Sequence, residues 1–266
     1  MSAKNSARNG WSEEYSRLFS WNWCRDYFKE QWLLLEKQNS TEEQNGEPFY
    51  KTHYKDVQLL EVSDPRGAYR VALKCYREKR FFRYFMRPSL AAREANGFDV
   101  VKAMGIPVVE VLAAGESRVL GHLQNAWFVT RFAENCETLL WFNDHPGEHE
   151  TLLQLLKETI CRLAALHKAN FIHGGAHPRN FLWKRSESGE LETIWLDLAT
   201  IRNVKNSRKY WKYILTDLSD LTEYFNLTQE ELDSLTAEYR KVNDIPVSYR
   251  RLSGHPRKLS EAYKAE

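Results

Sequence analysis

The sequence lacks any long apolar run, which excludes a membrane-spanning helix. No window of the 266 residues approaches the roughly eighteen consecutive apolar side chains that such a helix requires. The first residues, Met-Ser-Ala-Lys-Asn-Ser-Ala-Arg, also lack the apolar core of a secretory signal. We therefore expect the protein to remain in the cytoplasm.

Cysteine is scarce, and the charges nearly cancel. Cys24, Cys75, Cys136 and Cys161 lie far apart, so they form no metal-binding spacing, and we expect them to be reduced thiols. Lysine and arginine number 38 against 36 acidic residues, a formal net charge of +2 that gives no indication of a nucleic-acid partner. The length suffices for a sizeable core in one two-lobed domain or two small domains.

The spacing of apolar residues changes along the chain from the strand period to the helix period. Strands are expected at residues 57–62, 69–76, 108–113 and 126–132, and helices at 89–104, from about 150, and over most of the chain after 197. The turn sequence Ser63-Asp-Pro-Arg-Gly67 joins the first two strands into a hairpin. Strands followed by helices predict an α+β fold with two lobes.

The domain prediction follows these periods. Aromatic and charged residues alternate over 11–37 at helical spacing, so we expect a helix there, laid against the body of the domain. Residues 38–47 are polar and have the composition of a linker. The predicted parts are a helical N-terminal extension with its linker at 1–46, a β-rich N-lobe at 47–132 and a helical C-lobe at 133–266.

The segment His173-Gly-Gly-Ala-His-Pro-Arg-Asn180 has the spacing of a kinase catalytic loop. In such loops, His-x-Asp-x-x-x-x-Asn supplies a base and a metal ligand, and a second Asp follows at the end of an apolar strand. Here Asn180 is in place, and Asp197 follows the apolar run Ile194-Trp-Leu196. Glycine, Gly175, stands where the catalytic aspartate is expected.

Lys74 and Glu94 complete the candidate nucleotide site. A lysine ending an apolar strand can reach the α and β phosphates of ATP when a carboxylate about one helix later holds it in place. A lone strand lysine is usually a solvated charge, so this prediction depends on the combination with Asn180 and Asp197. The amide and carboxylate oxygens of those two residues suit magnesium.

Three other side chains near the loop have open interpretations. His173 most simply serves as a hydrogen-bonded structural hinge, whereas His177 could act as a weak base or as a donor to phosphate. Arg202 could pair with a phosphate or an activation-segment group, or it could be a surface charge.

The stretch from Tyr76 to Arg87 interleaves cations with aromatic residues. This composition is typical of a surface for anionic lipid or phosphorylated sugar. It also arises where arginine stems cover the edge of a core.

Together these residues resemble the lipopolysaccharide kinase family of Gram-negative bacteria, the Kdo/WaaP and InaA-like group. The segments that carry the resemblance are Leu73-Lys-Cys-Tyr76, Pro88-Ser-Leu-Ala-Ala-Arg-Glu-Ala95, Gly105-Ile-Pro-Val-Val-Glu-Val-Leu-Ala-Ala-Gly-Glu116, Leu166-His-Lys-Ala-Asn-Phe-Ile-His-Gly174 and Pro178-Arg-Asn-Phe-Leu182. The resemblance covers roughly residues 48–240 and implies a protein-kinase-like fold. It implies ATP with Mg²⁺ as donor and a core-sugar hydroxyl, Kdo or heptose, as acceptor. It also implies that the protein acts at the cytoplasmic face of the inner membrane, as a peripheral membrane protein. Its partner would then be the lipopolysaccharide core or another anionic envelope glycolipid.

Two departures from the family pattern leave three hypotheses open. Gly175 replaces the base, and the loop expected to cover the phosphates, near Thr52-His-Tyr-Lys-Asp56, has no glycine. A general base typically contributes about 10² to 10⁴ in rate, although phosphoryl transfer depends mostly on positioning and electrostatics. The chain is then a core-sugar kinase that is slow or uses another base, a nucleotide-binding pseudokinase that regulates envelope or stress machinery, or a small-molecule phosphotransferase.

Overall fold

The computed structural model describes residues 21–33, 47–51, 55–64, 67–76, 84–186, 188–205 and 209–244. The chain divides into two compact units, one of residues 1–96 with 109–133 and the other of residues 97–108 with 134–266. Each unit is described by itself below. No helix among the described residues is long and apolar enough to cross a membrane.

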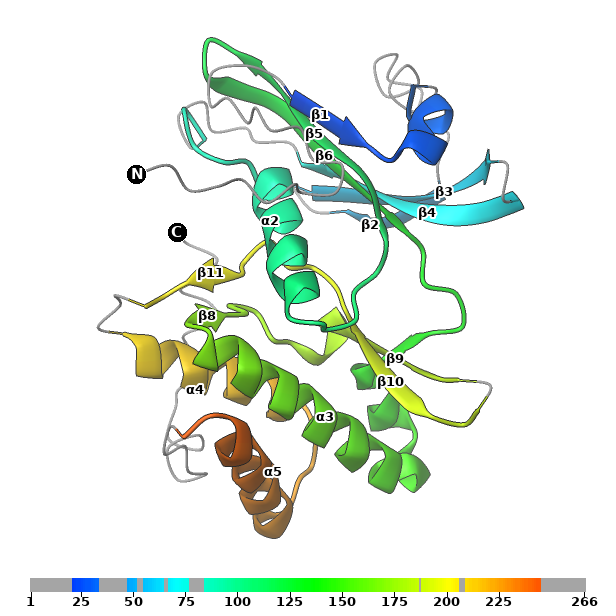
Figure 1. The fold of residues 1–266 in the computed structure, drawn as a ribbon. Helices are drawn as coiled ribbons and strands as arrows, with labels where there is room; N and C mark the ends of the chain where they lie inside the picture. The colour runs from blue at the N-terminus through cyan, green and yellow to red at the C-terminus, as the bar shows by residue number, and fades with distance from the viewer. Residues whose placement is uncertain are drawn as a thin grey trace. The chain divides into compact units, whose positions relative to one another are not determined.

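The first unit is built on a six-stranded antiparallel sheet (Figure 1). Its strands, in the order β1-β5-β6-β4-β3-β2, are β1 Trp21–Cys24, β5 Val111–Val119, β6 His122–Arg131, β4 Gly67–Tyr76, β3 Lys55–Asp64 and β2 Glu47–Lys51. The predicted hairpin is confirmed, since β3 and β4 pair in register from Lys55↔Tyr76 to Asp64↔Gly67.

The helix predicted over residues 11–37 is wrong at Trp21–Cys24, which form a strand, and confirmed at residues 29–33, which are helical. Trp21–Cys24 is a strand that pairs with β5, with Cys24 opposite Ala113. A 3-10 turn, η1 Asp26–Phe28, and helical residues 29–33 follow. Trp21 and Trp23 stand two residues apart, which is the strand period, and the helical spacing of Phe28 and Trp32 begins only after them. Residues 11–20 and 34–37 lie outside the described part.

The core of this unit lies against one face of the sheet. It consists of Phe28, Trp32, Val62, Val71, Leu73, Leu112, Ala113 and Val129. Because successive side chains of a strand point to opposite faces, Lys74 leaves the face that Val71 and Leu73 occupy. The strand thereby presents a lysine on the sheet's other side.

Helix α2, Leu90–Ala103, confirms the helix predicted at 89–104. The Ser89 hydroxyl accepts the Ala92 amide proton at 3.1 Å and caps the first turn. Gly105, with φ of 72°, follows the helix end in the left-handed conformation. The next strand begins later than predicted, at Val111, because Val108 forms an isolated bridge with Trp195 instead of joining the first sheet.

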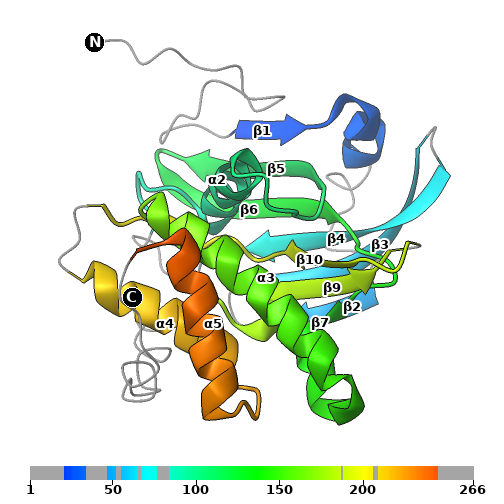
Figure 2. The same ribbon diagram turned by 60° about the horizontal axis from the view of Figure 1, so that its bottom comes forward.

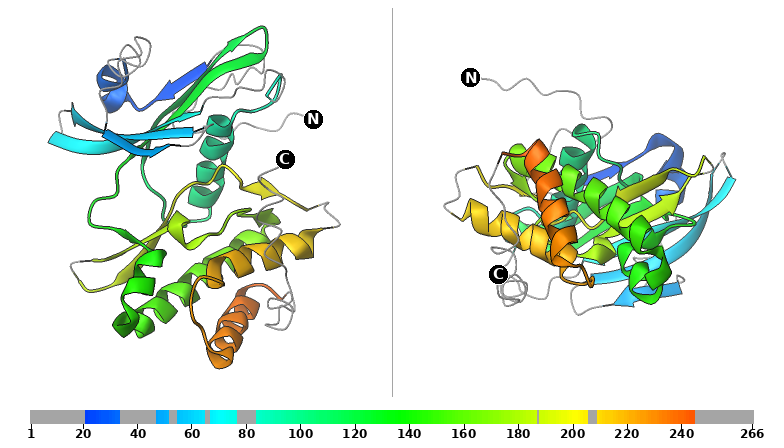
Figure 3. Two further views of the ribbon diagram at one scale, coloured as in Figure 1. Left: turned by 180° about the vertical axis from the view of Figure 1, so that it is seen from behind. Right: turned by 90° about the horizontal axis from the view of Figure 1, so that it is seen from below.

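The second unit is mainly helical. Its helices are α3 His149–Lys168, α4 Tyr210–Thr222 and α5 Gln229–Val242, with 3-10 turns η2 Leu139–Asp144, η3 Pro146–Glu148 and η4 Pro178–Asn180. Its short strands are β7 Glu137–Thr138, β8 Phe171–Ile172, β9 Phe181–Arg185, β10 Leu191–Trp195 and β11 Arg202–Asn203. Helices α3 and α5 lie side by side (Figures 2 and 3), and the turn η4 joins the loop after β8 to β9.

Candidate functional site

In the first unit, Lys74 and Glu94 form the predicted ion pair between a strand and a helix. The Lys74 ammonium lies 2.5 Å from Oε1 of Glu94. The Glu94 side chain is completely buried, and that of Lys74 is 11% exposed. The Tyr76 hydroxyl donates to the other oxygen, Oε2. A carboxylate buried in this way is costly unless it is paired, so the pair fixes the lysine head at one place.

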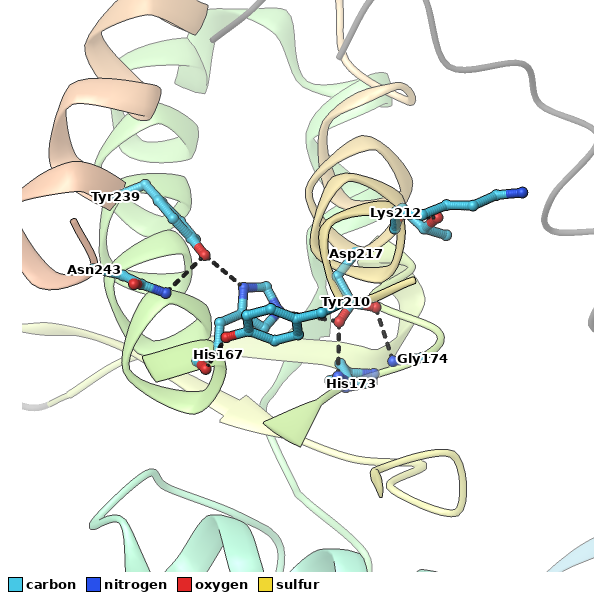
Figure 4. Close-up of polar contacts among 9 residues, drawn as sticks. His167, His173, Gly174, Tyr210, Lys212, Asp217, Tyr239 and Asn243 are labelled. Carbon is cyan, nitrogen blue, oxygen red and sulfur yellow. Dashed lines mark hydrogen bonds and ion pairs between the residues drawn. The ribbon is translucent and has the colours of Figure 1, made fainter. Parts of the chain in front are cut away.

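In the second unit, the loop after β8 is held by one buried carboxylate, Asp217 of α4. Its Oδ2 accepts the backbone N–H of His173 at 2.7 Å, and its Oδ1 accepts that of Gly174 at 2.8 Å (Figure 4). Gly174 has a φ of 72°, and a Cβ there would lie 2.9 Å from the carbonyl oxygen of Thr200. This bend and this close approach both require glycine.

A buried network of hydrogen bonds holds the Asp217 side chain in place. Nε2 of His167 lies 3.1 Å from Oδ2 of Asp217, and Nδ1 of His167 lies 3.0 Å from the Tyr239 hydroxyl. A carboxylate only accepts, so Nε2 carries the proton. Asn243 donates to Tyr239 at 3.1 Å, and Tyr210 donates to the backbone carbonyl of His167. Helices α3, α4 and α5 therefore meet at the group that shapes the loop (Figure 4).

No local signal in the sequence predicts that Asp217 anchors the loop. Asp217 lies 43 residues beyond Gly174 in an amphipathic helix, where an acidic residue is ordinary. The expected hinge, His173, is hydrogen-bonded to Asp217 through its backbone amide. Its fully buried ring packs on Phe181 and Trp195, and neither ring nitrogen has a hydrogen-bond partner among the described residues. Burial lowers the pKa of His173, so the ring is neutral.

Gly175 has ordinary backbone geometry and room for a Cβ. Its φ is not positive. The nearest atom to a Cβ added at this position would be the Thr200 hydroxyl oxygen, at 3.5 Å, which is an ordinary contact. A Cβ would fit here without strain, so the backbone at this position does not require glycine.

Asn180 and Asp197 follow the loop. The Asn180 amide nitrogen donates to the Gly175 carbonyl at 2.9 Å, while its oxygen makes no hydrogen bond to any described residue. The backbone N–H of Leu196 donates to the Asn180 carbonyl at 3.0 Å, which links the two segments. Asp197 has a φ of 55°, uncommon for a residue with a side chain and typical of positions where function demands the conformation.

These two side chains fit a magnesium ion by their donor type. An amide oxygen and a carboxylate are hard ligands, and Mg²⁺ takes few protein ligands while keeping waters and substrate phosphates. The described residues contain no group of three or more His, Cys, Asp or Glu able to hold a metal ion alone. A phosphate-assisted magnesium site is compatible with this sparse protein donor set.

His177 is half-buried in the loop. Its Nδ1 accepts the backbone N–H of Arg179 at 3.1 Å, and its ring packs on Tyr224 with centroids 4.2 Å apart. Burial, aided by the Arg179 charge, lowers the pKa of His177 to about 4. The neutral ring therefore carries its proton on Nε2, which makes no hydrogen bond to a described residue. This tautomer can donate to an anion, but it offers no free lone pair to a substrate proton.

The remaining predicted positions are outside the site or outside the described residues. Arg202 is exposed, and its guanidinium stacks on Tyr213 at 4.9 Å, which favours the surface interpretation. Residues 52–54 of the expected phosphate loop and 77–83 of the aromatic-basic stretch lie outside the described part.

Comparison with known proteins decides the family. A model described as the lipopolysaccharide kinase (Kdo/WaaP) family matches residues 57–239, more than half of the chain. The chain belongs to this family. No curated protein matches it significantly. A solved structure described as "WaaP in complex with acyl carrier protein" is similar to it, with a TM-score of 0.64 and 16% identity over 92% of this chain and 97% of that one.

The likeness to WaaP shows the fold. The predicted α+β, protein-kinase-like fold, with a β-rich N-lobe and a helical C-lobe, is confirmed. The resemblance to the lipopolysaccharide kinases is confirmed with it.

Proposed function

We propose that this family member binds Mg²⁺-ATP and transfers the γ-phosphoryl group to a hydroxyl of a lipopolysaccharide core sugar, Kdo or heptose. The observation that supports it most is the Lys74–Glu94 pair, a cation held at 2.5 Å by a fully buried carboxylate. A pair buried in this way does not serve as a solvated surface charge. It fixes the lysine head, and a fixed cation is what the positioning of phosphates requires.

In this proposal each residue has one task. Lys74 contacts the α and β phosphates, and Glu94 keeps it in place. Asn180 and Asp197 hold Mg²⁺, which supplies charge neutralisation at the phosphates when it is bound. His177 donates its Nε2 proton to a phosphate oxygen. The catalytic loop keeps its shape because Asp217 holds the amides of His173 and Gly174.

The alternative is a pseudokinase that binds nucleotide without transferring phosphate, and Gly175 is the observation that favours it. The loop anchor and the Lys74–Glu94 pair suit both alternatives, because both need a nucleotide site. We place either protein in the cytoplasm, with the core-sugar kinase working at the inner face of the inner membrane as a peripheral protein.

The test is transfer of γ-labelled phosphate from ATP to lipopolysaccharide core acceptors that lack phosphate. Wild type should label a core sugar in a Mg²⁺-dependent way, and Asp197→Asn should abolish labelling. Wild type that binds Mg²⁺-ATP yet labels no acceptor would establish the pseudokinase instead. Wild type that binds no nucleotide would contradict both.

A further inference from the structure

Two neighbouring turns of the first unit expose four large apolar side chains. Seven large apolar or aromatic side chains are exposed among the described residues, and these turns carry more than half of them. The four, which we call the apolar tip, are Phe85, Met86, Val119 and Leu120. Their exposed fractions run from 39% for Phe85 to 85% for Leu120. Exposed apolar groups of this kind mark surfaces of interaction.

Contacts between the two turns place these side chains on one surface. Phe85 and Met86 belong to the segment before α2, and Val119 and Leu120 to the turn that joins β5 to β6. The backbone N–H of Met86 donates to the Gly121 carbonyl at 3.2 Å. The ring of Phe85 packs on that of His122, with centroids 4.6 Å apart.

A buried guanidinium, that of Arg118, fixes both turns. Its Nη1 donates to the carbonyls of Tyr84 and Gly121, each at 3.0 Å, and its Nη2 donates to that of Arg87 at 2.7 Å. Its Nε lies 2.5 Å from Oε1 of Glu116, and both side chains of this pair are fully buried. Burying an ion pair is costly, and here it holds the two turns in one arrangement. The apolar tip is therefore preorganised.

The backbone of the apolar tip is also in a costly conformation. Met86 and Leu120 each have a φ of 50°, in the left-handed region that residues with large side chains seldom adopt. Neither side chain offsets this cost by burial in the protein core, because both are exposed. Such conformations cluster where function requires them, so they indicate that the apolar tip contacts something outside the chain.

The charge around the apolar tip is positive. Residues 84–93 and 117–125 contain no acidic side chain, whereas Arg87 and Arg93 are exposed. In the sequence, residues 77–83 lead into this segment with four cations and one acid. Apolar side chains beside cations suit the interface of an anionic bilayer. Four side chains are far fewer than the roughly 20–30 residues that each side of a stable protein interface contributes, which favours a membrane over a protein partner.

We propose that the apolar tip docks the protein on an anionic lipid bilayer. Met86 and Leu120 enter the boundary between headgroups and acyl chains, and Arg87 lies among the lipid phosphates. The inference rests on the proposed function in one respect, since the proposed acceptor is a membrane glycolipid. Docking concentrates the protein at the surface where that acceptor lies.

The experiment measures flotation of the full-length protein with lipid vesicles, in the absence of ATP and acceptor. Vesicles of phosphatidylglycerol and phosphatidylethanolamine supply an anionic surface, and vesicles of phosphatidylcholine supply a neutral one. Wild type should bind the anionic vesicles about tenfold or more tightly than the neutral ones, because each cation near an anionic surface contributes about fivefold. This preference should shrink as the salt concentration rises.

Four variants test which residues make the contact. Met86→Asn and Leu120→Asn keep the left-handed backbone, which asparagine adopts more readily than most residues. Each should weaken vesicle binding by about tenfold or more, because an apolar side chain no longer leaves water. Leu33→Asn, the same kind of change at a 50% exposed position outside the apolar tip, is the matched control and should bind as wild type does. Arg87→Gln should weaken binding to anionic vesicles by about fivefold and leave binding to neutral vesicles unchanged.

The outcomes separate docking from phosphoryl transfer. A wild type that does not float with anionic vesicles overturns the inference, and so do Met86→Asn and Leu120→Asn proteins that float as well as wild type. Dimerisation that these two variants abolish, without vesicle binding by wild type, also overturns it, because a second copy is then the occupant. The affinity for Mg²⁺-ATP should be the same in all four variants as in wild type, since none of the proposed ligands belongs to the apolar tip. A wild type that binds vesicles through the apolar tip but transfers no phosphate refutes the proposed kinase and leaves the docking surface established.

Discussion

Replacing Gly97 with alanine should displace the backbone next to Asp197, the residue that we propose as a metal ligand. Gly97 is buried in the middle of α2, where a glycine-to-alanine change ordinarily gains about 0.5–1 kcal/mol. A Cβ at this position would lie only 2.1 Å from the Leu198 carbonyl oxygen and 2.9 Å from Leu198 Cβ. Since non-bonded carbon and oxygen need roughly 3.2 Å, the backbone after Asp197 must withdraw by about 1 Å, and such overpacking costs about 1–3 kcal/mol.

We therefore expect Gly97→Ala to destabilise the protein by about 0.5–2 kcal/mol, the overpacking cost less the gain in helix propensity. Because Leu198 follows Asp197 directly, we also expect Mg²⁺-ATP binding to weaken by about tenfold or more. Urea unfolding and calorimetric titration measure the two effects. The control is Gly147→Ala, where a Cβ would meet nothing within 4 Å, so the ATP affinity should stay unchanged and the stability should not fall. A Gly97→Ala protein as stable as wild type and with unchanged affinity would refute the close approach of α2 to Leu198.

Three further variants test the rest of the site. Lys74→Met leaves the buried Glu94 carboxylate without its cation, so it should lower the free energy of unfolding in urea by about 3 kcal/mol. It should also weaken ATP binding by about tenfold or more. Unchanged affinity would exclude Lys74 from the nucleotide site. Asp217→Asn removes the charged acceptor of two loop amides and should lower the free energy of unfolding by about 2–4 kcal/mol. The control Asp233→Asn, at an exposed position, should lower it by almost nothing. Equal stabilities of the two variants would contradict the role of Asp217 as the anchor of the loop. His173 has a pKa lowered below its unfolded value of 6.5, so its neutral form favours folding above that pH and this advantage is lost as the pH falls. His173→Phe keeps the ring packing and should make stability fall less between about pH 7.5 and about pH 5 than in wild type; parallel curves would contradict the buried neutral ring.

Much of the fold can be predicted because each signal is local. The hairpin of β3 and β4 follows from two apolar runs around a Pro-Gly turn, and α2 follows from its period and from Gly105 at its end. The Lys74–Glu94 pair can be predicted because a strand lysine and a helix carboxylate in this order belong to one known arrangement. Strand β1 escapes prediction because its four residues precede a helical aromatic pattern that dominates the surrounding window.

The anchor of the catalytic loop cannot be predicted, since it depends on contacts distant in sequence. Asp217 and His167 are 50 residues apart, and each is unremarkable in its own helix. Gly97 has no signal of its own within its helix, and only the nearby Leu198 carbonyl shows why a side chain is excluded there.

The central proposal is that the protein binds Mg²⁺-ATP with Asn180 and Asp197 as the protein ligands of the metal. Calorimetric titration of ATP into wild type and into Asp197→Asn, each with Mg²⁺ and with EDTA, tests it most directly. We predict one site in wild type whose affinity falls by about tenfold or more when EDTA removes the metal, and an Asp197→Asn protein whose weak binding does not respond to Mg²⁺. Equal ATP affinity in all four titrations, or a full Mg²⁺ response in Asp197→Asn, would contradict it.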